Sequence, residues 1–189
     1  MFNNKTILIT GGTGSFGKKF SKIALSKFKK IKIIIFSRDE MKQWEMDKEF
    51  NSNNLKFIIG DIRDLESLNK AMKGVDYVIH AAATKIITAA EDNPEECIKT
   101  NVNGTINVAK AAIQNSVKKL IALSTDKACN PTNFYGASKL LSEKIILSEN
   151  KYQNYTKMSV VRYGNVLGSR GSVVPFFQSL NKNEPIPIT

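Results

Sequence analysis

Short apolar runs rich in β-branched residues alternate with longer segments of helical periodicity along the chain. The runs predicted as strands are 6–10, 31–36, 57–59, 77–79, 120–123 and 159–162, and the predicted helices are 15–28, 39–50, 65–72, 94–115 and 135–147. Because the strands are almost continuously apolar, we expect a parallel sheet that helices cover on both faces. Right-handed crossovers between such strands give a doubly wound α/β fold.

The composition is that of one ordinary globular domain. The 189 residues are 42% hydrophobic and 24% charged, and a chain of this size buries a sizeable core. No apolar run reaches the roughly 20 residues needed to cross a bilayer, and the first residues lack a signal-peptide pattern. Cys97 and Cys129 match no metal spacing or disulfide framework, which favours free thiols in a reducing compartment. We therefore expect a cytoplasmic protein without a membrane anchor.

The formal net charge of +11 comes mainly from lysine, since 24 of the 28 basic residues are Lys and four are Arg. Arginine is the usual residue for reading bases and clamping buried phosphates, and these lysines are scattered along the chain. A solvated, lysine-rich surface explains this pattern. The alternatives are nucleic-acid binding and the electrostatic steering of an anionic substrate. We expect no nucleic-acid partner.

A glycine-rich turn, residues 11–17, lies directly between the first strand and the first helix. Glycine there permits a tight turn and a close backbone approach to a pyrophosphate, which rests on the helix N-terminus. A plain strand-to-helix turn is the alternative, but the position after the first strand of a βαβ unit favours dinucleotide binding. The predicted cofactor contacts in this turn are Gly11, Thr13, Gly14, Ser15, Phe16 and Gly17.

The end of the second strand bears on which dinucleotide binds. An acid at this point usually contacts the ribose hydroxyls of NAD, whereas a guanidinium and a hydroxyl fit the 2′-phosphate of NADP. Ser37, Arg38 and Lys42 favour NADP. NAD remains the alternative because Asp39 is an acid in this segment, although it also suits a helix cap. The predicted cofactor contacts here are Ser37, Arg38, Asp39 and Lys42, with Asp61 and Ile62 placed to meet the adenine.

Tyr135 and Lys139 are one helical turn apart and therefore share a helix face. A lysine ammonium close to a phenol lowers the pKa of the phenol, which creates a base usable near neutral pH. A half-buried tyrosine beside a surface lysine is the alternative interpretation of this spacing. The dinucleotide turn upstream favours the catalytic one.

The order of these motifs resembles that of the extended short-chain dehydrogenase/reductases over the entire chain. The motifs concerned are Gly11-x-x-Gly14-x-x-Gly17, Gly60-Asp61, His80-Ala81-Ala82-Ala83, Thr125 and Tyr135-x-x-x-Lys139. Segments 123–127, 162–166 and 169–175 are similar to those of C5-inverting UDP-N-acetylglucosamine 4,6-dehydratases of the pseudaminic acid pathway type. The resemblance implies a Rossmann fold and an NADP-dependent lyase that makes a UDP-4-keto-6-deoxy-hexosamine for surface-glycan or flagellin sugars.

The triplet Thr125-Asp126-Lys127 carries the functional distinction within that family, because retaining dehydratases have Glu where the inverting type has Lys. By resemblance, Tyr135 takes the 4-hydroxyl proton, Thr125 bonds the 4-oxygen and Lys127 removes the proton from C5. A protonated Asp126 assists loss of the 6-hydroxyl. Lys127 is expected to be buried, with the charge of Lys139 lowering its pKa. A loop ion pair between Asp126 and Lys127 is the alternative.

The resemblance implies further contacts beyond the catalytic group. For the cofactor these are Ala81, Ala82, Ala83, Asn101, Tyr135, Lys139, Tyr163, Asn165 and Val166. For the substrate they are Lys85, Asn165, Arg170, Gly171, Ser172 and Val173. The chain departs from the family pattern after Lys85, where Ile86-Ile87-Thr88 replaces the usual His/Gln-Val-Pro. His80, the only histidine, is interpreted as structural, so neither a His-based triad nor a metal site is expected.

We expect residues 1–189 to form an NADP-binding domain that includes the start of a substrate-binding region, 168–189. Family members continue further, so the chain is expected to be truncated before its C-terminal substrate subdomain and to be inactive alone. The full-length protein is expected to be a homo-oligomer that binds a UDP-sugar. Two other functions stay open: a nucleotide-sugar C4-epimerase, which does not need Asp126 and Lys127, and a non-catalytic NADP-binding regulator, which does not need Tyr135 and Lys139.

Overall fold

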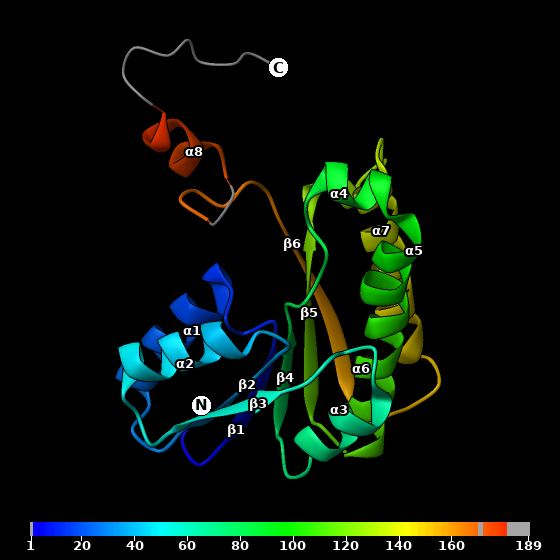
Figure 1. Ribbon diagram of the computed structural model, residues 1–189. Helices are drawn as coiled ribbons and strands as arrows, with labels where there is room; N and C mark the ends of the chain where they lie inside the picture. The colour runs from blue at the N-terminus through cyan, green and yellow to red at the C-terminus, as the bar shows by residue number, and fades with distance from the viewer. Residues whose placement is uncertain (1, 170–171, 181–189) are drawn as a thin grey trace.

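The structure, a computed structural model, describes residues 2–169 and 172–180 (Figure 1). Within them, one six-stranded sheet contains β1 (Thr6–Thr10), β2 (Lys32–Ser37), β3 (Leu55–Ile59), β4 (Tyr77–His80), β5 (Lys119–Thr125) and β6 (Lys157–Tyr163). All six strands were predicted from the sequence. Several are longer than their apolar runs, because polar residues at their ends, such as Lys119 and Thr125, also pair in register with the next strand.

Five predicted helical segments are present, with one important difference. The matching helices are α1 (Ser15–Lys27), α2 (Glu40–Phe50), α3 (Leu65–Ala71) and α7 (Phe134–Glu149). The segment predicted as one helix over 94–115 is divided into α5 (Pro94–Cys97), a π-helical segment η1 (Ile98–Asn103) and α6 (Gly104–Gln114). Three short elements lie outside the sequence prediction: α4 (Ile87–Asp92), the 3₁₀ turn η2 (Asp126–Ala128) and α8 (Val173–Ser179).

Side-chain caps explain where several helices begin. Asp39 accepts a hydrogen bond from the backbone N–H of Lys42 at the start of α2, and Asn133 accepts one from Gly136 at the start of α7. Asp64 accepts two such bonds at the start of α3. Each cap satisfies a donor that has no partner within its helix.

The sheet is entirely parallel, and its strand order is β3-β2-β1-β4-β5-β6. The chain runs outward from β1 to β3 and then returns to the other side of β1, where β4 pairs with it. This reversal creates a switch point at the carboxyl ends of β1 and β4, where open α/β sheets bind their ligands. The doubly wound arrangement predicted from the sequence is confirmed.

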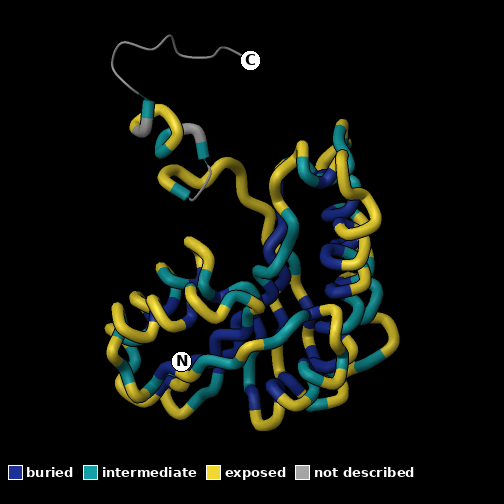
Figure 2. Tube along the Cα trace, in the orientation of Figure 1, coloured by how far each residue is buried: buried dark blue, intermediate teal, exposed yellow. Residues whose placement is uncertain are grey.

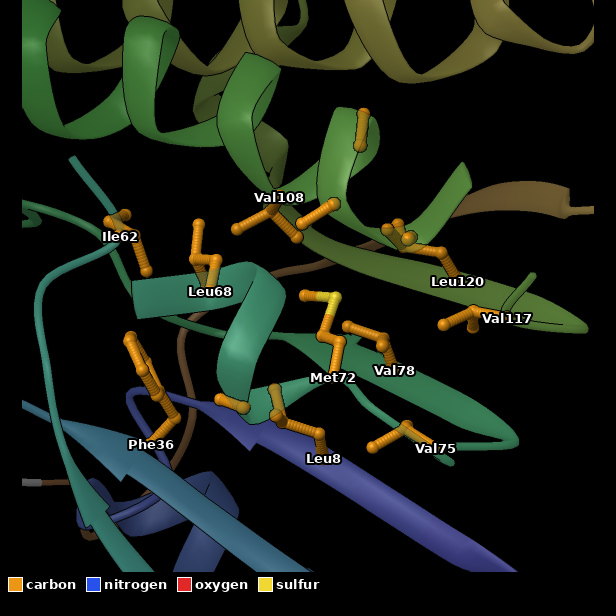
Figure 3. Close-up of a cluster of buried hydrophobic side chains, with 14 of the residues drawn as sticks. Leu8, Phe36, Ile62, Leu68, Met72, Val75, Val78, Val108, Val117 and Leu120 are labelled. Atoms are coloured by element: carbon orange, nitrogen blue, oxygen red, sulfur yellow. The ribbon is translucent and has the colours of Figure 1, made fainter. Parts of the chain in front are cut away.

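The alternation of side chains along β1 separates two hydrophobic cores. Leu8 belongs to the core beneath α3 and α6, which Figure 3 shows together with Phe36, Leu68 and Met72. Its neighbours Ile7 and Ile9 belong to the core on the opposite face, where α1 and α2 lie. Buried positions follow the strands through the middle of the molecule, as Figure 2 shows. In the described part of the chain, no helix is both long and apolar enough to span a membrane.

Candidate active site

The turn between β1 and α1 is built so tightly that only glycine fits at two of its positions. Gly11 adopts φ +65°, and a Cβ there would lie 2.7 Å from the Cα of Ala82. A Cβ on Gly17 would lie 2.1 Å from the carbonyl oxygen of Gly12. The first turn of α1 carries no acidic residue, and its N-cap Gly14 makes no side-chain cap. This backbone cradle fits a pyrophosphate on the positive end of α1.

The residues expected to select the cofactor lie together after β2. Gln43, which sequence reasoning missed, donates to both the Oγ and the carbonyl oxygen of Ser37 and so fixes the end of the strand. Asp39 has the capping role expected of it, and it also pairs with the side chain of Lys42. The side chain of Arg38 is 62% exposed. Asp39 is thus occupied and Arg38 is accessible to a ligand, but the carboxylate of Asp61 lies 3.8 Å from the Arg38 guanidinium.

The loop after β3 presents Asp61 near the same region. Arg63 donates to Asp61 from its Nε at 2.8 Å, and Arg38 lies 3.8 Å from the same carboxylate. Burial acts to raise the pKa of Asp61, but the hydrogen bonds and charge of Arg63 and the charge of Arg38 lower it overall. Ile62 is buried against Gly104, where a Cβ would come within 2.5 Å of its Cδ1 atom. Of the two residues predicted to meet the adenine, Asp61 is therefore the polar one and Ile62 is the apolar, buried one.

Asn101 connects the loop after β4 to α7 rather than facing open space. It is 1% exposed, its Oδ1 accepts from the backbone N–H of Thr84 at 2.8 Å, and its Nδ2 donates to the carbonyl oxygen of Thr84 and to Ser138. Its predicted cofactor contact stays a prediction, because the described partners of its side chain are protein groups. Ala81, Ala82 and Ala83 run past the glycine turn, with Ala82 directly against Gly11.

The predicted catalytic residues meet at the carboxyl end of β5. Thr125 donates to Asp126 at 2.9 Å and also hydrogen-bonds Tyr135 of α7. Burial raises the pKa of Tyr135, and the hydrogen bond with Thr125 opposes that rise only in part. The structure therefore places Thr125 in contact with both Asp126 and Tyr135, and their catalytic roles stay predictions. The expected lowering of the pKa of the phenol is not found in the structure.

Lys139 lies close behind this group but is held by the backbone. It is 5% exposed, and its Nζ donates to the carbonyl oxygen of Leu123 at 2.8 Å. Burial lowers the pKa of Lys139 to about 8, although the charge of Glu143 acts to raise it. The alternative interpretation of Lys139 as a surface lysine is wrong, because tertiary packing covers this face of α7.

Asp126 and Lys127 form the ion pair that the sequence left as an alternative, and the pair lies within the site. Lys127 Nζ donates to Asp126 at 3.3 Å and to Oδ1 of Asn165 at 3.2 Å, so a predicted substrate contact lies beside the predicted base. Two expectations need correction. The side chain of Lys127 is 32% exposed rather than buried. The hydrogen bonds from Thr125 and Lys127 lower the pKa of Asp126, which favours its carboxylate over the protonated form.

His80 is a structural residue, as its sequence context indicated. It is buried between the hydroxyls of Thr10, 2.7 Å from Nδ1, and Thr105, 3.0 Å from Nε2. Because Thr105 donates its proton to the carbonyl oxygen of Asn101, it accepts from Nε2–H, and Nδ1 accepts from Thr10. Burial and the charge of Lys139 lower the pKa of His80 to about 3, so the ring is neutral.

The remaining predicted site residues follow β6 and β4. Tyr163 ends β6 opposite Thr125 in register, and burial raises the pKa of its phenol. Asn165, Val166 and Lys85 are exposed, the last in the loop between β4 and α4. Ser172 is the N-cap residue of α8, which begins at Val173. Arg170 and Gly171 lie outside the described residues.

Sequence reasoning missed a cluster of polar groups behind Lys139, in which Ser124 and Glu143 are buried and Arg162 is exposed. Its members are Ser124 on β5, Glu143 on α7 and Arg162 on β6, with both carboxylate oxygens of Glu143 bound. The only signal was the four-residue spacing between Lys139 and Glu143, which places them on one helix face. Glu143 otherwise has the pattern of a surface residue.

The strand order, the glycine cradle at β1 and the Thr125–Tyr135–Lys139 group define a dinucleotide-binding protein of the short-chain dehydrogenase/reductase class. Comparison with known proteins agrees with this class. The chain belongs to the family of polysaccharide biosynthesis proteins, whose family model matches residues 7–189. The resemblance inferred from the motifs is confirmed.

Individual relatives are more specific. The chain is 58% identical over its whole length to a UDP-N-acetylglucosamine 4,6-dehydratase (inverting) of Campylobacter jejuni, and 48% identical to a UDP-glucose 4-epimerase of Rickettsia prowazekii. It spans 58% and 57% of the lengths of these two relatives. The solved structure of Pen from Bacillus thuringiensis has a TM-score of 0.90 and 44% identity, covering 94% of this chain and 55% of that one.

A more distant structure shares the fold alone. DesIV of Streptomyces venezuelae, a dTDP-glucose 4,6-dehydratase solved with NAD and DAU bound, has a TM-score of 0.75 at 22% identity, covering 82% of this chain and 54% of that one.

Proposed function

We propose that this chain is the cofactor-binding part of a UDP-N-acetylglucosamine 4,6-dehydratase that inverts C5 and uses NADP. The observation that carries the proposal is the contact of Lys127 with both Asp126 and Asn165, beside Thr125 and Tyr135. An acid and an amine next to a proton-accepting tyrosine are the groups that water elimination from a 4-keto sugar requires. The inverting dehydratase of C. jejuni, at 58% identity, supports the assignment.

The residues divide the proton transfers among themselves. A bound nicotinamide would supply the hydride acceptor for C4 and the hydride donor for C6. Tyr135 takes the proton of the 4-hydroxyl, while Thr125 orients that oxygen. The 4-ketone acidifies the C5 proton, which Lys127 removes. For Lys127 to act as this base, its ammonium proton first passes across the 3.3 Å contact to Asp126, which leaves a neutral amine and a carboxylic acid that releases the 6-hydroxyl as water. After hydride has been added at C6, C5 takes up a solvent-derived proton on its opposite face, which gives the inversion. This relay explains how an Asp126 that begins ionised can act as an acid.

The substrate half of the site is proposed to lie largely beyond residue 189. Residues 1–189 form the NADP domain, and 168–189 begin the region that holds the sugar. Pseudaminic acid as the pathway product, a homo-oligomer and a cytoplasmic location stay predictions.

A nucleotide-sugar C4-epimerase is the second candidate, because epimerases of Rickettsia are 48% identical to this chain. The two reactions share Tyr135, Thr125 and Lys139 but differ in their need for Lys127. The two reactions are therefore distinguished by whether the proton on C5 of the sugar is removed.

The test uses the whole protein incubated with UDP-N-acetylglucosamine in deuterated water, with the product identified by mass and NMR. We expect a 4-keto-6-deoxy product labelled at C5. Lys127→Ala should lower the dehydration rate by about 10²–10⁴-fold, the usual cost of losing a general base, while leaving cofactor affinity intact. Lys144→Ala, at an exposed position of α7, is the matched control. A C4 epimer as the only product, or normal C5 labelling by Lys127→Ala, contradicts the proposal.

A further inference from the structure

A buried carboxylate lies one helical turn beyond Lys139. The side chain of Glu143 is 7% exposed. Its Oε1 accepts from Ser124 Oγ at 2.5 Å and from Arg162 Nε at 2.8 Å, and its Oε2 accepts from the second nitrogen of the same guanidinium at 2.6 Å. Such a bidentate ion pair fixes the orientation of the carboxylate as well as pairing its charge, because the guanidinium is planar and its donors have fixed directions.

The three groups of this cluster come from the three elements that form the reaction centre. Ser124 immediately precedes Thr125 on β5, and Arg162 lies opposite Ser124 in register on β6. Glu143 shares α7 with Tyr135 and Lys139. Holding Glu143 therefore holds α7 against the ends of both strands, and with it the distance from Lys139 to β5.

Lys139 and Glu143 are four residues apart on α7 and therefore share a face of that helix. The Lys139 ammonium is buried, with one hydrogen bond to the carbonyl oxygen of Leu123. Of the described groups, the charge of Glu143 raises the pKa of Lys139, and so does Cys97 of α5, while burial lowers it. The charge of Lys139 also acts on His80 of β4, whose ring is neutral, and Tyr135 lies one helical turn away on α7. Glu143 is the carboxylate among these groups, and Arg162 neutralises part of its charge.

We propose that Glu143 is a positioning residue for Lys139: clamped by Ser124 and Arg162 one helical turn from Lys139, its carboxylate holds α7, and with it the Lys139 ammonium, against β5. Arg162 sets the strength of the charge interaction between the two groups, because a cation on the far side of the carboxylate weakens its attraction for Lys139. The inference rests on the proposed function only in that Lys139 acts there as an ammonium.

Two substitutions that should shift the pKa of Lys139 in opposite directions test this arrangement in the whole protein. Glu143→Gln removes the counter-charge, so the pKa of Lys139 should fall from about 8 by about one unit or more. Arg162→Met removes the competing cation and should raise the same pKa. The measurement is the pH titration of the ¹³Cε resonance of Lys139 in lysine-labelled protein, assigned by its absence in Lys139→Met. A merely structural role would not produce shifts of opposite sign.

The pH profile of cofactor reduction by UDP-N-acetylglucosamine supplies a second readout. Its alkaline limb, where Lys139 loses its proton, should move to lower pH in Glu143→Gln and to higher pH in Arg162→Met. Glu143→Asp, which keeps the charge, should stay closer to the wild-type limb than Glu143→Gln does. Glu149→Gln, near the other end of α7, is the control and should change neither readout.

The outcomes separate this inference from the proposed function. An unchanged pKa of Lys139 in Glu143→Gln, or shifts of the same sign in both variants, overturns the role of Glu143. If the resonance shifts with opposite signs as expected but the whole protein dehydrates no UDP-sugar, the role of Glu143 stands and the proposed function fails.

Discussion

The predicted preference for NADP over NAD depends on Arg38, because its sequence neighbours leave the choice open. Its guanidinium projects from the end of β2, while Asp39 is occupied by its cap and by Lys42. An acid engaged in this way is poorly placed to bind the ribose hydroxyls that NAD presents. The choice between NADP and NAD therefore depends mainly on Arg38 rather than on Asp39, and the preference for NADP stays a prediction.

We expect NADP to bind at least tenfold more tightly than NAD, since a charge-assisted hydrogen bond contributes about 1.5–3 kcal/mol. Arg38→Ala should remove most of this preference by weakening NADP binding and should leave NAD binding within about twofold. Titration calorimetry of both cofactors measures the difference, with Lys48→Ala at the far end of α2 as control. Equal affinities in the unsubstituted chain would remove the argument from Arg38.

His80 should make the stability of the domain depend on pH above the range where carboxylates titrate. The folded pKa is lowered to about 3 from an ordinary 6.5, so the unfolded chain binds the extra proton between these values. The stabilisation is therefore complete above about pH 6.5 and is lost as the pH falls towards 3. Between pH 7 and 5.5 this amounts to about 1 kcal/mol of unfolding free energy.

Urea unfolding at these two pH values measures the His80 effect. His80 is the only histidine of the chain, so His80→Gln should flatten the pH dependence even where it lowers stability at both pH values. A slope that persists in His80→Gln would show that another group titrates in this range.

At the scale of elements, the π-helical segment η1 explains why the segment predicted as one helix is interrupted. It turns Asn101 into the interior, where its amide bonds the loop after β4 on one side and Ser138 of α7 on the other. π-helical turns inside helices often occur at functional sites. Here the interruption ties the loop that follows the switch-point strand to the helix that carries Tyr135 and Lys139.

Asn101→Ala should lower the unfolding free energy by about 2–3 kcal/mol, because it leaves buried backbone groups of Thr84 without their partners. It should also weaken cofactor binding through the loop that contacts Gly11. Asn107→Ala is the matched control. Its amide also bonds backbone carbonyls, but in a more exposed setting, and its cost should stay within about 1 kcal/mol. Denaturant unfolding compares the two, and equal costs would contradict the role of Asn101.

At the scale of the whole chain, the glycine turn of the predicted cofactor site lies within the described residues, whereas Arg170 and Gly171 of the predicted substrate region lie outside them. The chain spans 58% of the length of its dehydratase relative, and Lys127 and Asn165 remain accessible at the carboxyl edge of the sheet. The two ligands of the proposed reaction should therefore stabilise residues 1–189 unequally.

Thermal unfolding of residues 1–189 should shift clearly upward with NADP and little with UDP-N-acetylglucosamine, since stabilisation follows affinity for the folded state. Adding the sugar nucleotide to the whole protein is the comparison and should produce the larger shift. Strong stabilisation of residues 1–189 by UDP-N-acetylglucosamine would contradict the proposed division between the cofactor and substrate regions.

From the sequence alone, the fold class, the six strands and the positions of the glycine turn, Thr125, Tyr135 and Lys139 were predictable. The reason is that these features depend on local chemistry: period and β-branching define the strands, and glycine is required where a Cβ would collide. Gly17 shows this dependence directly, because a Cβ there would collide with the carbonyl oxygen of Gly12.

Only the tertiary structure decided which charged groups are buried and which of them meet. Glu143 and Arg162 are polar residues of unremarkable sequence context, and 19 positions separate them along the chain. They pair because β6 lies beside β5 and α7 covers both. The exposed side chain of Lys127, the ionised Asp126 and the π-helical segment around Asn101 likewise depend on contacts between distant segments, because desolvation and hydrogen bonding act through space and leave no local pattern in the sequence.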